Sequence, residues 1–401
     1  MAENKQNKRP NVPPLRFPEF TEPWDRNKLS CFLYENKERN KADFFSKEDV
    51  LSVSGELGIV NQIELLGRSF AGKSVKDYHI VRKGNIVYTK SPLKEFPYGI
   101  IKYNRGVDGI VSTLYAVYHV LDNADGRFIE FYFTDKGRIN RYLKPIVRIG
   151  AKHDMKIGNE EVLDNYVVMP TLVEQDKIAT FIELLDKRIA MQSKLIEQLE
   201  SLIKGITLKA SKSSDCESVL LSDILTERNE ANTAQHEVCS VSVSQGVVNQ
   251  VEYLGRSFAA KDISHYNVVH YGDIIYTKSP TGDFPYGIVK RSHLEDPVAV
   301  SPLYGVYIPA SNDIGCFLHY YFCNAVSAKN YLHKLIQKGA KNTINITNQR
   351  FLENTINLPK ADKLAQVVAL LNCLSNKKQQ SDSLLVLLNK QKHFFLNQMF
   401  I

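Results

Sequence analysis

The chain has 401 residues, which predicts two or three domains, because a single hydrophobic core rarely grows beyond about 250–300 residues. A content of 43% hydrophobic and 24% charged residues is typical of globular proteins and excludes wholesale disorder. The net charge of +7, from 51 Lys and Arg against 44 Asp and Glu, suits a polyanionic partner but does not by itself select one.

The cysteines and the N-terminal residues indicate the compartment. The six cysteines form no C-x-x-C pair, and no His pair lies near them at zinc-ligand spacing, so we expect free thiols that are mostly buried. The first 14 residues lack the apolar core of a signal peptide, and no run reaches the roughly 18 apolar residues of a membrane span. We therefore expect a cytoplasmic protein without a membrane partner.

A long internal repeat organises the chain. The segment GIVNQIELLGRSFAGK begins at Gly58, and GVVNQVEYLGRSFAAK begins 188 residues later at Gly246. After a one-residue insertion the offset becomes 189, which pairs Pro170 with Pro359. This period is too long for a solenoid, whose repeats run about 20–50 residues. The sequence therefore predicts two homologous domains.

Taken in chain order, the predicted parts alternate between mixed domains and long helices. Short β-branched and aromatic runs at 85–89, 109–120 and 164–169 predict strands, while 128–143 and its copy 317–332 have a helical pattern. A Ser- and Lys-rich stretch between the copies marks a linker. The expected parts are a tail 1–19, a domain 20–168, a helix 169–210, a linker 211–218, a domain 219–358 and a helix 359–401.

The segment GRSFAGKS at Gly67–Ser74 fits the phosphate-binding pattern G-x-x-x-x-G-K-[ST]. That loop must follow a strand and open a helix, whereas the residues that follow Ser74 have a strand pattern. The second copy reads GRSFAAKD, with Ala260 and Asp262 in place of Gly72 and Ser74. We therefore predict no nucleotide site in this loop.

No other motif indicates a catalytic, cofactor or metal site. The histidines His79, His153, His265 and His293 are interpreted as surface or hydrogen-bonded residues. An enzyme with two duplicated active sites and a coiled-coil adaptor that binds only proteins remain open as alternatives.

Both copies keep short segments that mix a cation, a hydroxyl and an aromatic ring. Arg and Lys bind phosphate or a guanine edge, Ser binds phosphate, and Asn reads adenine. The alternative is that the rings lie in the core and the cations on a solvated face. The predicted DNA-binding residues are Arg68, Ser69, Lys73, Lys90, Ser91, Tyr98, Lys152 and His153 in the first copy, and Arg256, Ser257, Lys261, Lys278, Ser279, Tyr286, Lys341 and Asn342 in the second.

Each domain is followed by a long stretch whose apolar residues alternate in spacing between three and four, the pattern of a coiled-coil seam. Both stretches open with a proline, which is tolerated in a first helical turn. The alternative is that each helix packs on its own domain. The seam residues are Ile178, Ile182, Leu185, Ile189, Ile196, Leu199 and Ile203 in the first stretch and Val367, Leu371, Leu374, Leu385 and Leu388 in the second, which Lys378 and Lys392 interrupt.

These features resemble the specificity subunit of type I restriction–modification enzymes. The segment PPLRFPEFTEPWDRNKLS from Pro13 and the helical segment PTLVEQDKIATFIELLDKRIAMQSKLIEQLESLIKGI from Pro170 are similar to that family. The resemblance implies an α+β chain with two target-recognition domains, separated by two long helices that form an antiparallel coiled coil with a pseudo-twofold axis. The second helical region departs from the family because it lacks the Glu-Gln start.

The resemblance also implies a function. Each recognition domain reads one half of a split double-stranded DNA target, and the helices set the gap and dock two modification subunits. Those partners bind S-adenosylmethionine and methylate adenine, while restriction subunits bind ATP and Mg and cleave DNA. The chain itself is then non-catalytic and binds no cofactor. Because the two domains are so alike, we expect half-sites that are similar or partly inverted copies.

Overall fold

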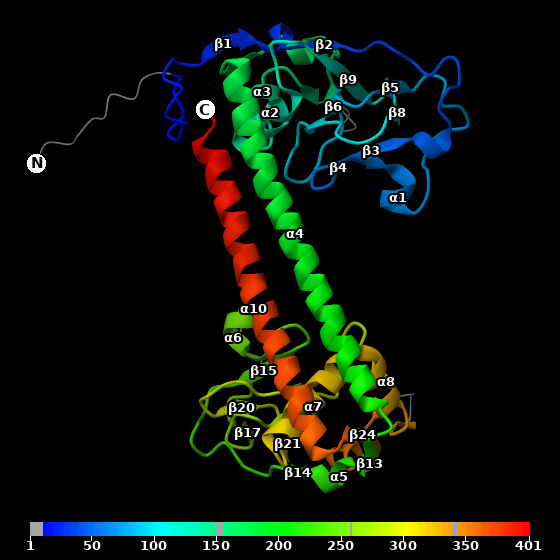
Figure 1. The fold of residues 1–401 in the computed structure, drawn as a ribbon, viewed down its shortest axis with the longest axis vertical. Coiled ribbons are helices and arrows are strands. Elements are labelled where there is room, and N and C mark those ends of the chain that lie inside the picture. Colours follow the sequence, from blue (N-terminus) through cyan, green and yellow to red (C-terminus); the bar gives the residue numbers. More distant parts are fainter. Residues whose placement is uncertain (1–10, 150–154, 257–258, 339–343) are drawn as a thin grey trace, which may run out of the picture. The chain divides into compact units, whose positions relative to one another are not determined.

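The computed structural model describes residues 11–149, 155–256, 259–338 and 344–401. The chain divides into two compact units (Figure 1). The first unit comprises residues 1–191 and 385–401, and the second comprises residues 192–384. Each of the two long helices therefore contributes one part to each unit.

The first unit is built around a four-stranded antiparallel sheet with the order β2-β9-β6-β7. Strand β6 is central and is buried along its whole length, because it is covered on both faces. The strands are β1 (Asp25–Lys28), β2 (Leu33–Glu35), β3 (Leu51–Ser54), β4 (Gly58–Asn61), β5 (His79–Val81), β6 (Ile86–Thr89), β7 (Ile101–Tyr103), β8 (Gly109–Val111), β9 (Tyr115–Val120), β10 (Arg148–Ile149), β11 (Met155–Lys156) and β12 (Tyr166–Met169). The helices are α1 (Gln62–Leu66), α2 (Gly126–Tyr132), α3 (Lys136–Leu143) and the start of α4 (Leu172–Ser211).

The second unit repeats this arrangement, with a four-stranded sheet in the order β14-β21-β18-β19. Its paired strands β13-β24, β15-β16, β17-β20 and β22-β23 correspond to β1-β12, β3-β4, β5-β8 and β10-β11 of the first unit. The strands are β13 (Cys216–Leu220), β14 (Leu225–Glu227), β15 (Cys239–Ser242), β16 (Gly246–Asn249), β17 (Asn267–Val269), β18 (Ile274–Tyr276), β19 (Val289–Arg291), β20 (Val298–Val300), β21 (Gly305–Pro309), β22 (Gln337–Lys338), β23 (Ile344–Asn345) and β24 (Thr355–Pro359). The helices are α5 (Leu221–Ile224), α6 (Gln250–Leu254), α7 (Asn312–Cys323), α8 (Ala325–His333), α9 (Asn348–Phe351) and the start of α10 (Ala361–Gln398).

The duplication extends further upstream than the sequence analysis found. The pattern E-x-x-E-x-N begins at Glu35 and again at Glu227, at an offset of 192 residues. Its second acid makes equivalent contacts in the two units. Glu38 pairs with Arg82 at 2.9 Å, and Glu230 contacts His270, the repeat equivalent of Arg82, also at 2.9 Å. A four-residue length difference before Gly58 hid this part of the repeat.

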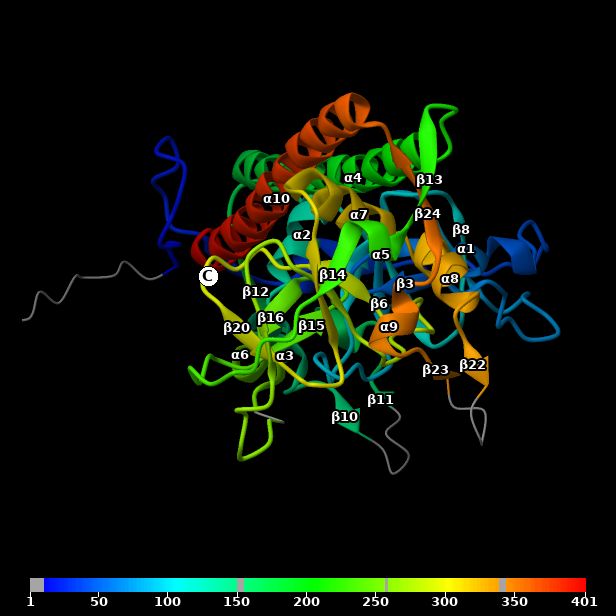
Figure 2. The same cartoon turned by 90° about the horizontal axis from the view of Figure 1, so that it is seen from below.

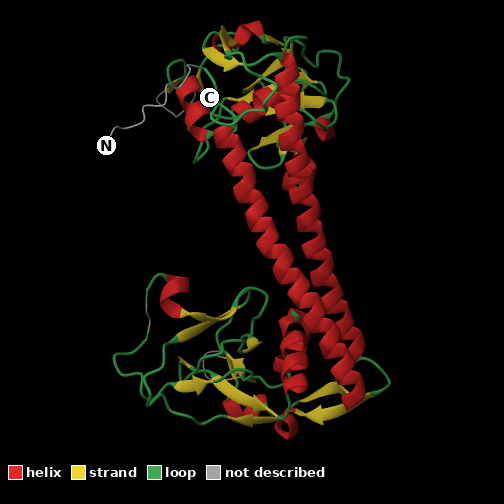
Figure 3. Cartoon of the chain, turned by 60° about the vertical axis from the view of Figure 1, so that its left-hand side comes forward, coloured by secondary structure: helices red, strands yellow, loops and turns green. Residues whose placement is uncertain are grey.

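Helices α4 and α10 lie side by side and run antiparallel (Figures 1 and 3). In the first unit the rings of Phe181 and Phe395 meet edge to face, with centroids 4.8 Å apart. In the second unit the Gln192 side chain donates to the Ser381 carbonyl at 3.0 Å. From Phe181 to Gln192 the residue number on α4 increases, while that of the contact residue on α10 decreases from Phe395 to Ser381. This is the order that an antiparallel pair requires. The predicted fold class is thus confirmed.

The seam positions all turn away from solvent. Ile178, Ile182, Leu185, Ile196, Leu199, Leu371 and Leu388 are buried, and Ile189, Ile203, Val367, Leu374 and Leu385 are half-buried. The two lysines in the second seam find acids on α4. Lys378 lies 3.2 Å from Glu200 in the second unit, and Lys392 pairs with Asp186 in the first.

The two long helices start differently. At the start of α4, Glu174 and Gln175 are both buried, and Gln175 accepts from the Asp125 backbone and donates to the Pro170 carbonyl, each at 2.9 Å. At the equivalent positions of α10, Lys363 pairs with Asp215 and Leu364 is buried in the core. An apolar contact therefore replaces the Glu-Gln pair that the second region lacks.

Three details differ from the sequence predictions. The segment 128–143 is two helices rather than one, because Asp135 caps a new helix by accepting from the Arg138 backbone at 2.7 Å. Pro170 and Pro359 precede the long helices instead of lying in their first turns.

The third difference concerns the thiols. All six cysteines are free, but only Cys239 and Cys316 are buried. His79, predicted to be a surface or hydrogen-bonded residue, is buried and hydrogen-bonded to the Asn36 backbone, while its Nδ1 has no hydrogen-bond partner in the part of the chain that the structure describes. No helix among the described residues is long and apolar enough to cross a membrane.

Candidate nucleic-acid interface

The loop that carries Arg68 and Lys73 connects α1 to β5. Gly67 ends α1 with φ +73°, a left-handed conformation that glycine adopts without strain. The order is therefore helix, loop, strand, the reverse of the strand, loop, helix order that a phosphate-binding loop needs. This agrees with the prediction that GRSFAGKS is not a nucleotide site.

One contact that holds this loop recurs in both units. The Phe70 backbone donates to Gln62 Oε1 at 2.6 Å, and the Gly72 backbone donates to the Tyr78 hydroxyl at 3.4 Å. In the second unit the Ala260 backbone donates to the Tyr266 hydroxyl at 3.0 Å. Tyr266 is the repeat equivalent of Tyr78, so the loop is a built feature that the duplication has kept.

The two cations of the first loop, Arg68 and Lys73, are exposed. No carboxylate in the described part of the chain pairs with Arg68 or Lys73, whereas the nearby Lys41 and Lys76 pair with Asp77 and Asp43. The Arg68 guanidinium instead lies 4.6 Å from the ring centroid of Phe70, which is 57% exposed. A guanidinium stacked on an exposed ring keeps its N–H donors available for an anion. Ser69 Oγ accepts from the Ala71 backbone within the loop.

A second loop meets the first at a shallow pocket. Phe70 and Ala71 line it together with Ser91, which follows β6, and Leu114, which lies between β8 and β9. The pocket has a volume of about 180 Å³. Ser91 and Leu114 are exposed there. Ser91 thus lines one pocket together with Phe70, the ring on which Arg68 stacks.

Lys90 points into its domain instead of toward solvent. Its ammonium donates to the Ile157 carbonyl at 3.0 Å and to the Asn159 side chain. Burial lowers the pKa of Lys90. In the second unit burial likewise lowers the pKa of Lys278, and the buried Oδ1 of Asn348, the equivalent of Asn159, has no partner among the described residues.

The predicted tyrosines lie partly in the cores. Tyr98 packs against the core of the first unit and Tyr286 against that of the second. Their carbonyls accept from the hydroxyls of Tyr88 and Tyr276 at 2.7 and 2.8 Å. In the second unit Arg256, Lys261 and Ser279 are exposed.

Five of the predicted DNA-binding residues lie outside the described part of the chain: Lys152, His153, Ser257, Lys341 and Asn342. The paired strands β10-β11 and β22-β23 flank four of them, each at the periphery of its own unit (Figure 2).

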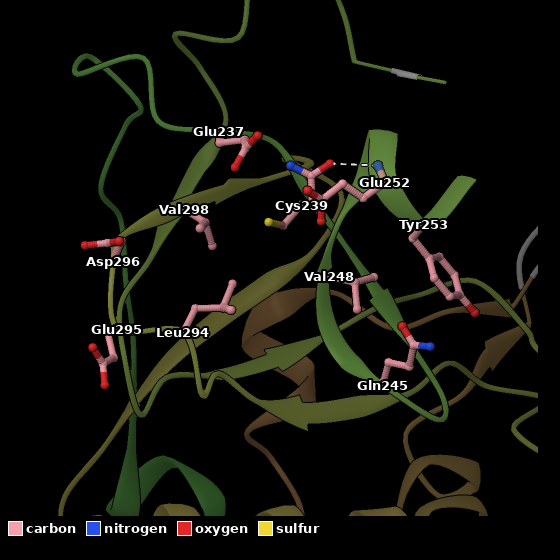
Figure 4. A pocket seen from close by; sticks show the side chains of 11 residues that line it. Glu237, Cys239, Gln245, Val248, Glu252, Tyr253, Leu294, Glu295, Asp296 and Val298 are labelled. Carbon is pink, nitrogen blue, oxygen red and sulfur yellow. Dashed lines mark hydrogen bonds between the residues drawn. The ribbon is translucent and has the colours of Figure 1, made fainter. Parts of the chain in front are cut away.

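The second unit also has an acidic pocket of about 610 Å³ between β15, β16 and α6. Its rim carries Glu237, Glu252, Glu295 and Asp296, and its floor includes Val248 and other apolar side chains (Figure 4). Four carboxylates repel phosphate, so this pocket is not a DNA contact. Among the described residues no group of three or more His, Cys, Asp or Glu is placed to hold a metal ion.

Sequence reasoning missed the residues that support these loops. Gln62 and Gln250 donate to the Ser52 and Ser240 hydroxyls, both at 3.1 Å. The shared run V-N-Q, whose glutamine is the first residue of α1 and of α6, was a signal for them. Asn159, which accepts a hydrogen bond from Lys90, was missed although it recurs as Asn348.

The chain was compared with known proteins. No family model matches it, and no curated protein is significantly similar in sequence. Its structure is similar to the S subunit of a type I restriction–modification system from M. genitalium, with a TM-score of 0.58 at 12% identity, over 97% of this chain and 99% of that one. The two chains thus share a fold over almost their whole length.

Two other solved chains are similar over most of their length. One is the HsdS subunit from Thermoanaerobacter tengcongensis, with 14% identity, a TM-score of 0.44 and coverage of 94% and 96%. The other belongs to a structure on assembly and conformational transition of the type I R-M system, with 12% identity, a TM-score of 0.48 and coverage of 94% and 97%.

Proposed function

We propose that this chain is the DNA-specificity subunit of a type I restriction–modification complex. The observation that carries the proposal is the fold shared with an S subunit over 97% of the chain. A duplicated domain followed each time by a long helix supports it, because two like domains suit a target read in two parts. Residues 20–168 and 219–358 are the two recognition domains in this proposal.

The DNA-binding surface of each domain is the loop after α1 or α6 together with its neighbours. Arg68 and Lys73, and their copies Arg256 and Lys261, bind phosphate or guanine edges, since exposed cations are the groups that DNA-binding proteins use for both. Ser91 and Ser279 supply hydroxyl donors beside them. Lys90 positions the loop after β6 and does not contact DNA, because its ammonium is hydrogen-bonded to Ile157 and Asn159 inside the domain. The predicted contacts at Lys152, His153, Ser257, Lys341 and Asn342 complete the surface.

The chain supplies recognition and no chemistry. Two modification subunits dock on the α4–α10 pair, bind S-adenosylmethionine and methylate adenine, and restriction subunits bind ATP and cleave DNA. The complex acts in the cytoplasm. Because Arg68, Ser69 and Lys73 recur as Arg256, Ser257 and Lys261, the two half-sites are similar in sequence.

Two experiments test this function. Fluorescence anisotropy with duplex DNA should give an affinity that falls steeply with salt, because phosphate contacts release counterions. Coexpression with a modification subunit, followed by sequencing of methylated adenines, should give one split motif. A protein-only adaptor would have no salt-dependent DNA affinity, and an enzyme would act on its own with a cofactor. Two half-sites of unrelated sequence would contradict the proposal that the half-sites are similar. They would leave intact the proposal that the target is read in two parts.

A further inference from the structure

Two cations of the second unit lie buried on β19. Lys290 is 6% exposed and Arg291 is 3% exposed. The Arg291 guanidinium donates to Asn312 Oδ1 at 2.7 Å and stands over the Tyr271 ring, 4.8 Å from its centroid. Within the described ranges, no carboxylate pairs with either cation. Because burying an uncompensated charge is costly, a negative or easily ionised group is expected beside them.

The group beside Lys290 is the thiol of Cys323, the last residue of α7. Lys290 Nζ lies 3.2 Å from Cys323 Sγ, and His319 Nε2 lies 3.7 Å from the same sulfur. His319 Nδ1 accepts a hydrogen bond from the Arg291 backbone at 3.2 Å, so the imidazole proton is on Nε2 and is directed at the sulfur. Burial lowers the pKa of His319 to about 3, which keeps the ring neutral. The sulfur thus receives two donors.

The first unit has a different arrangement at the equivalent positions. There Lys102, the copy of Lys290, lies 3.5 Å from Glu130, and Arg105 pairs with the same carboxylate. Glu130 is the copy of His319, and Thr134 is the copy of Cys323. The second unit therefore has a histidine in place of this carboxylate and a thiol beside the equivalent lysine. Among the described residues, the sulfur of Cys323 is a hydrogen-bond partner of the Lys290 ammonium.

We propose that Cys323 is a covalent modification site for soft electrophiles, with Lys290 and His319 stabilising the charge that develops on the sulfur. In the reaction with a haloacetamide, a sulfur–carbon bond forms as the carbon–halogen bond breaks; the halide leaves and the thiol proton passes to water. The C-terminal end of α7 opposes negative charge on Cys323, so Lys290 is the deciding group. Cys323 is half-buried, unlike the buried Cys239 and Cys316.

The other cysteines are internal references. Cys31 and Cys373 are exposed, whereas Cys239 and Cys316 are buried. Burial raises the pKa of Cys239 to about 11, which makes that thiol a poor nucleophile. If exposure alone decided reactivity, Cys31 and Cys373 would react first. The proposal predicts that Cys323 reacts first.

The test is timed labelling of the folded full-length chain with iodoacetamide at neutral pH, read peptide by peptide by mass spectrometry. We expect Cys323 to be labelled about tenfold faster than Cys31 and Cys373, as for thiols beside a cation. Lys290→Met should remove this advantage and leave the other rates unchanged. Lys102→Met, the matched change in the first unit, should leave Cys323 as reactive as before. Equal labelling of Cys323 and Cys373, or a Lys290→Met chain that labels as fast, would overturn the proposal.

If the Lys290→Met variant does not fold, the same arrangement can be built into the first unit and tested there. In the first unit, Thr134→Cys places a thiol near Lys102, which is still paired with Glu130, and this thiol should react slowly. Adding Glu130→His releases Lys102 and supplies the imidazole, so the same thiol should react about tenfold faster. No difference between the single and double variants would contradict the role given to Lys290 and His319.

Discussion

The Gln192 side chain donates a 3.0 Å hydrogen bond to the Ser381 carbonyl, and these two residues are the same position of the duplicated helix. When two equivalent helices pair in antiparallel orientation, the local twofold axis passes through the point where equivalent positions of the two helices meet. A polar contact at such a point fixes the register of a helix pair, because sliding by one turn leaves the polar group unpaired.

Gln192→Ala should lower the free energy of unfolding by about 1 kcal/mol, the usual net contribution of one hydrogen bond. Gln198→Ala is the matched control, because Gln198 is exposed on the same helix and such changes stay within about 0.5 kcal/mol. Urea unfolding followed by circular dichroism measures both. Equal effects would show that the contact does not stabilise the pair.

Ile182→Ala should destabilise the first unit by about 2–5 kcal/mol, because Ile182 is fully buried in the same core as Trp24. Leu184, two residues further on, is 58% exposed, so Leu184→Ala should have little effect. Trp24 is the only tryptophan, and its fluorescence reports unfolding of this unit. A large effect of Leu184→Ala in the isolated chain would contradict the observed face of α4.

Glu174→Gln should cost on the order of 3–5 kcal/mol, because it leaves a shielded guanidinium without its charge partner. Glu174 is 1% exposed and accepts two 2.7 Å bonds from Arg16 and a 3.2 Å bond from the Trp24 indole. Thermal unfolding read by tryptophan fluorescence measures the loss. The exposed Glu197 on the same helix provides the control Glu197→Gln, which should leave the midpoint unchanged.

Acid should destabilise the first unit through His79. Burial, helped by the nearby Arg39 charge, lowers the pKa of His79 from 6.5 to about 4. Above pH 6.5 the ring is neutral in both states and its contribution is complete. Between pH 6.5 and 4 only the unfolded state takes up the proton. The free energy of unfolding therefore decreases as the pH is lowered through this range, by up to about 3 kcal/mol.

His79→Asn should flatten this dependence. Asn267 occupies the equivalent position of the second unit, where it donates to the Tyr304 carbonyl at 3.0 Å, so the change suits the fold. Urea midpoints at pH 7 and pH 5, read by Trp24 fluorescence, should differ less in the variant. An unchanged difference would mean that other groups cause the acid sensitivity.

Lys73→Ala should weaken DNA binding and reduce the slope of log affinity against log salt by about 1, as expected for one lost phosphate contact. Lys41→Ala is the control, because Lys41 is exposed in the same unit but paired with Asp77. Anisotropy titrations at several salt concentrations measure both slopes. If the slope of log affinity against log salt decreases equally in the two variants, the charge of the whole unit rather than the loop governs binding.

The sequence by itself determined the duplication and the helix pair. Segments such as GRSFA recur almost unchanged, and a spacing of three and four residues places one stripe of side chains on one helix face. Both signals are local, so no tertiary information was needed. The shared residues around Arg68 and Lys73 marked the candidate surface in the same way.

Only the tertiary structure decided what those residues contact. Lys90 turns inward because Asn159, far along the chain, accepts a hydrogen bond from its ammonium, and His79 is buried by strands that the sequence does not place beside it. Lys102 and Lys290 look identical in the repeat, yet one faces a carboxylate and the other a thiol. A repeat shows which residues recur, whereas their protonation and reactivity depend on neighbours that only folding brings within a few ångströms.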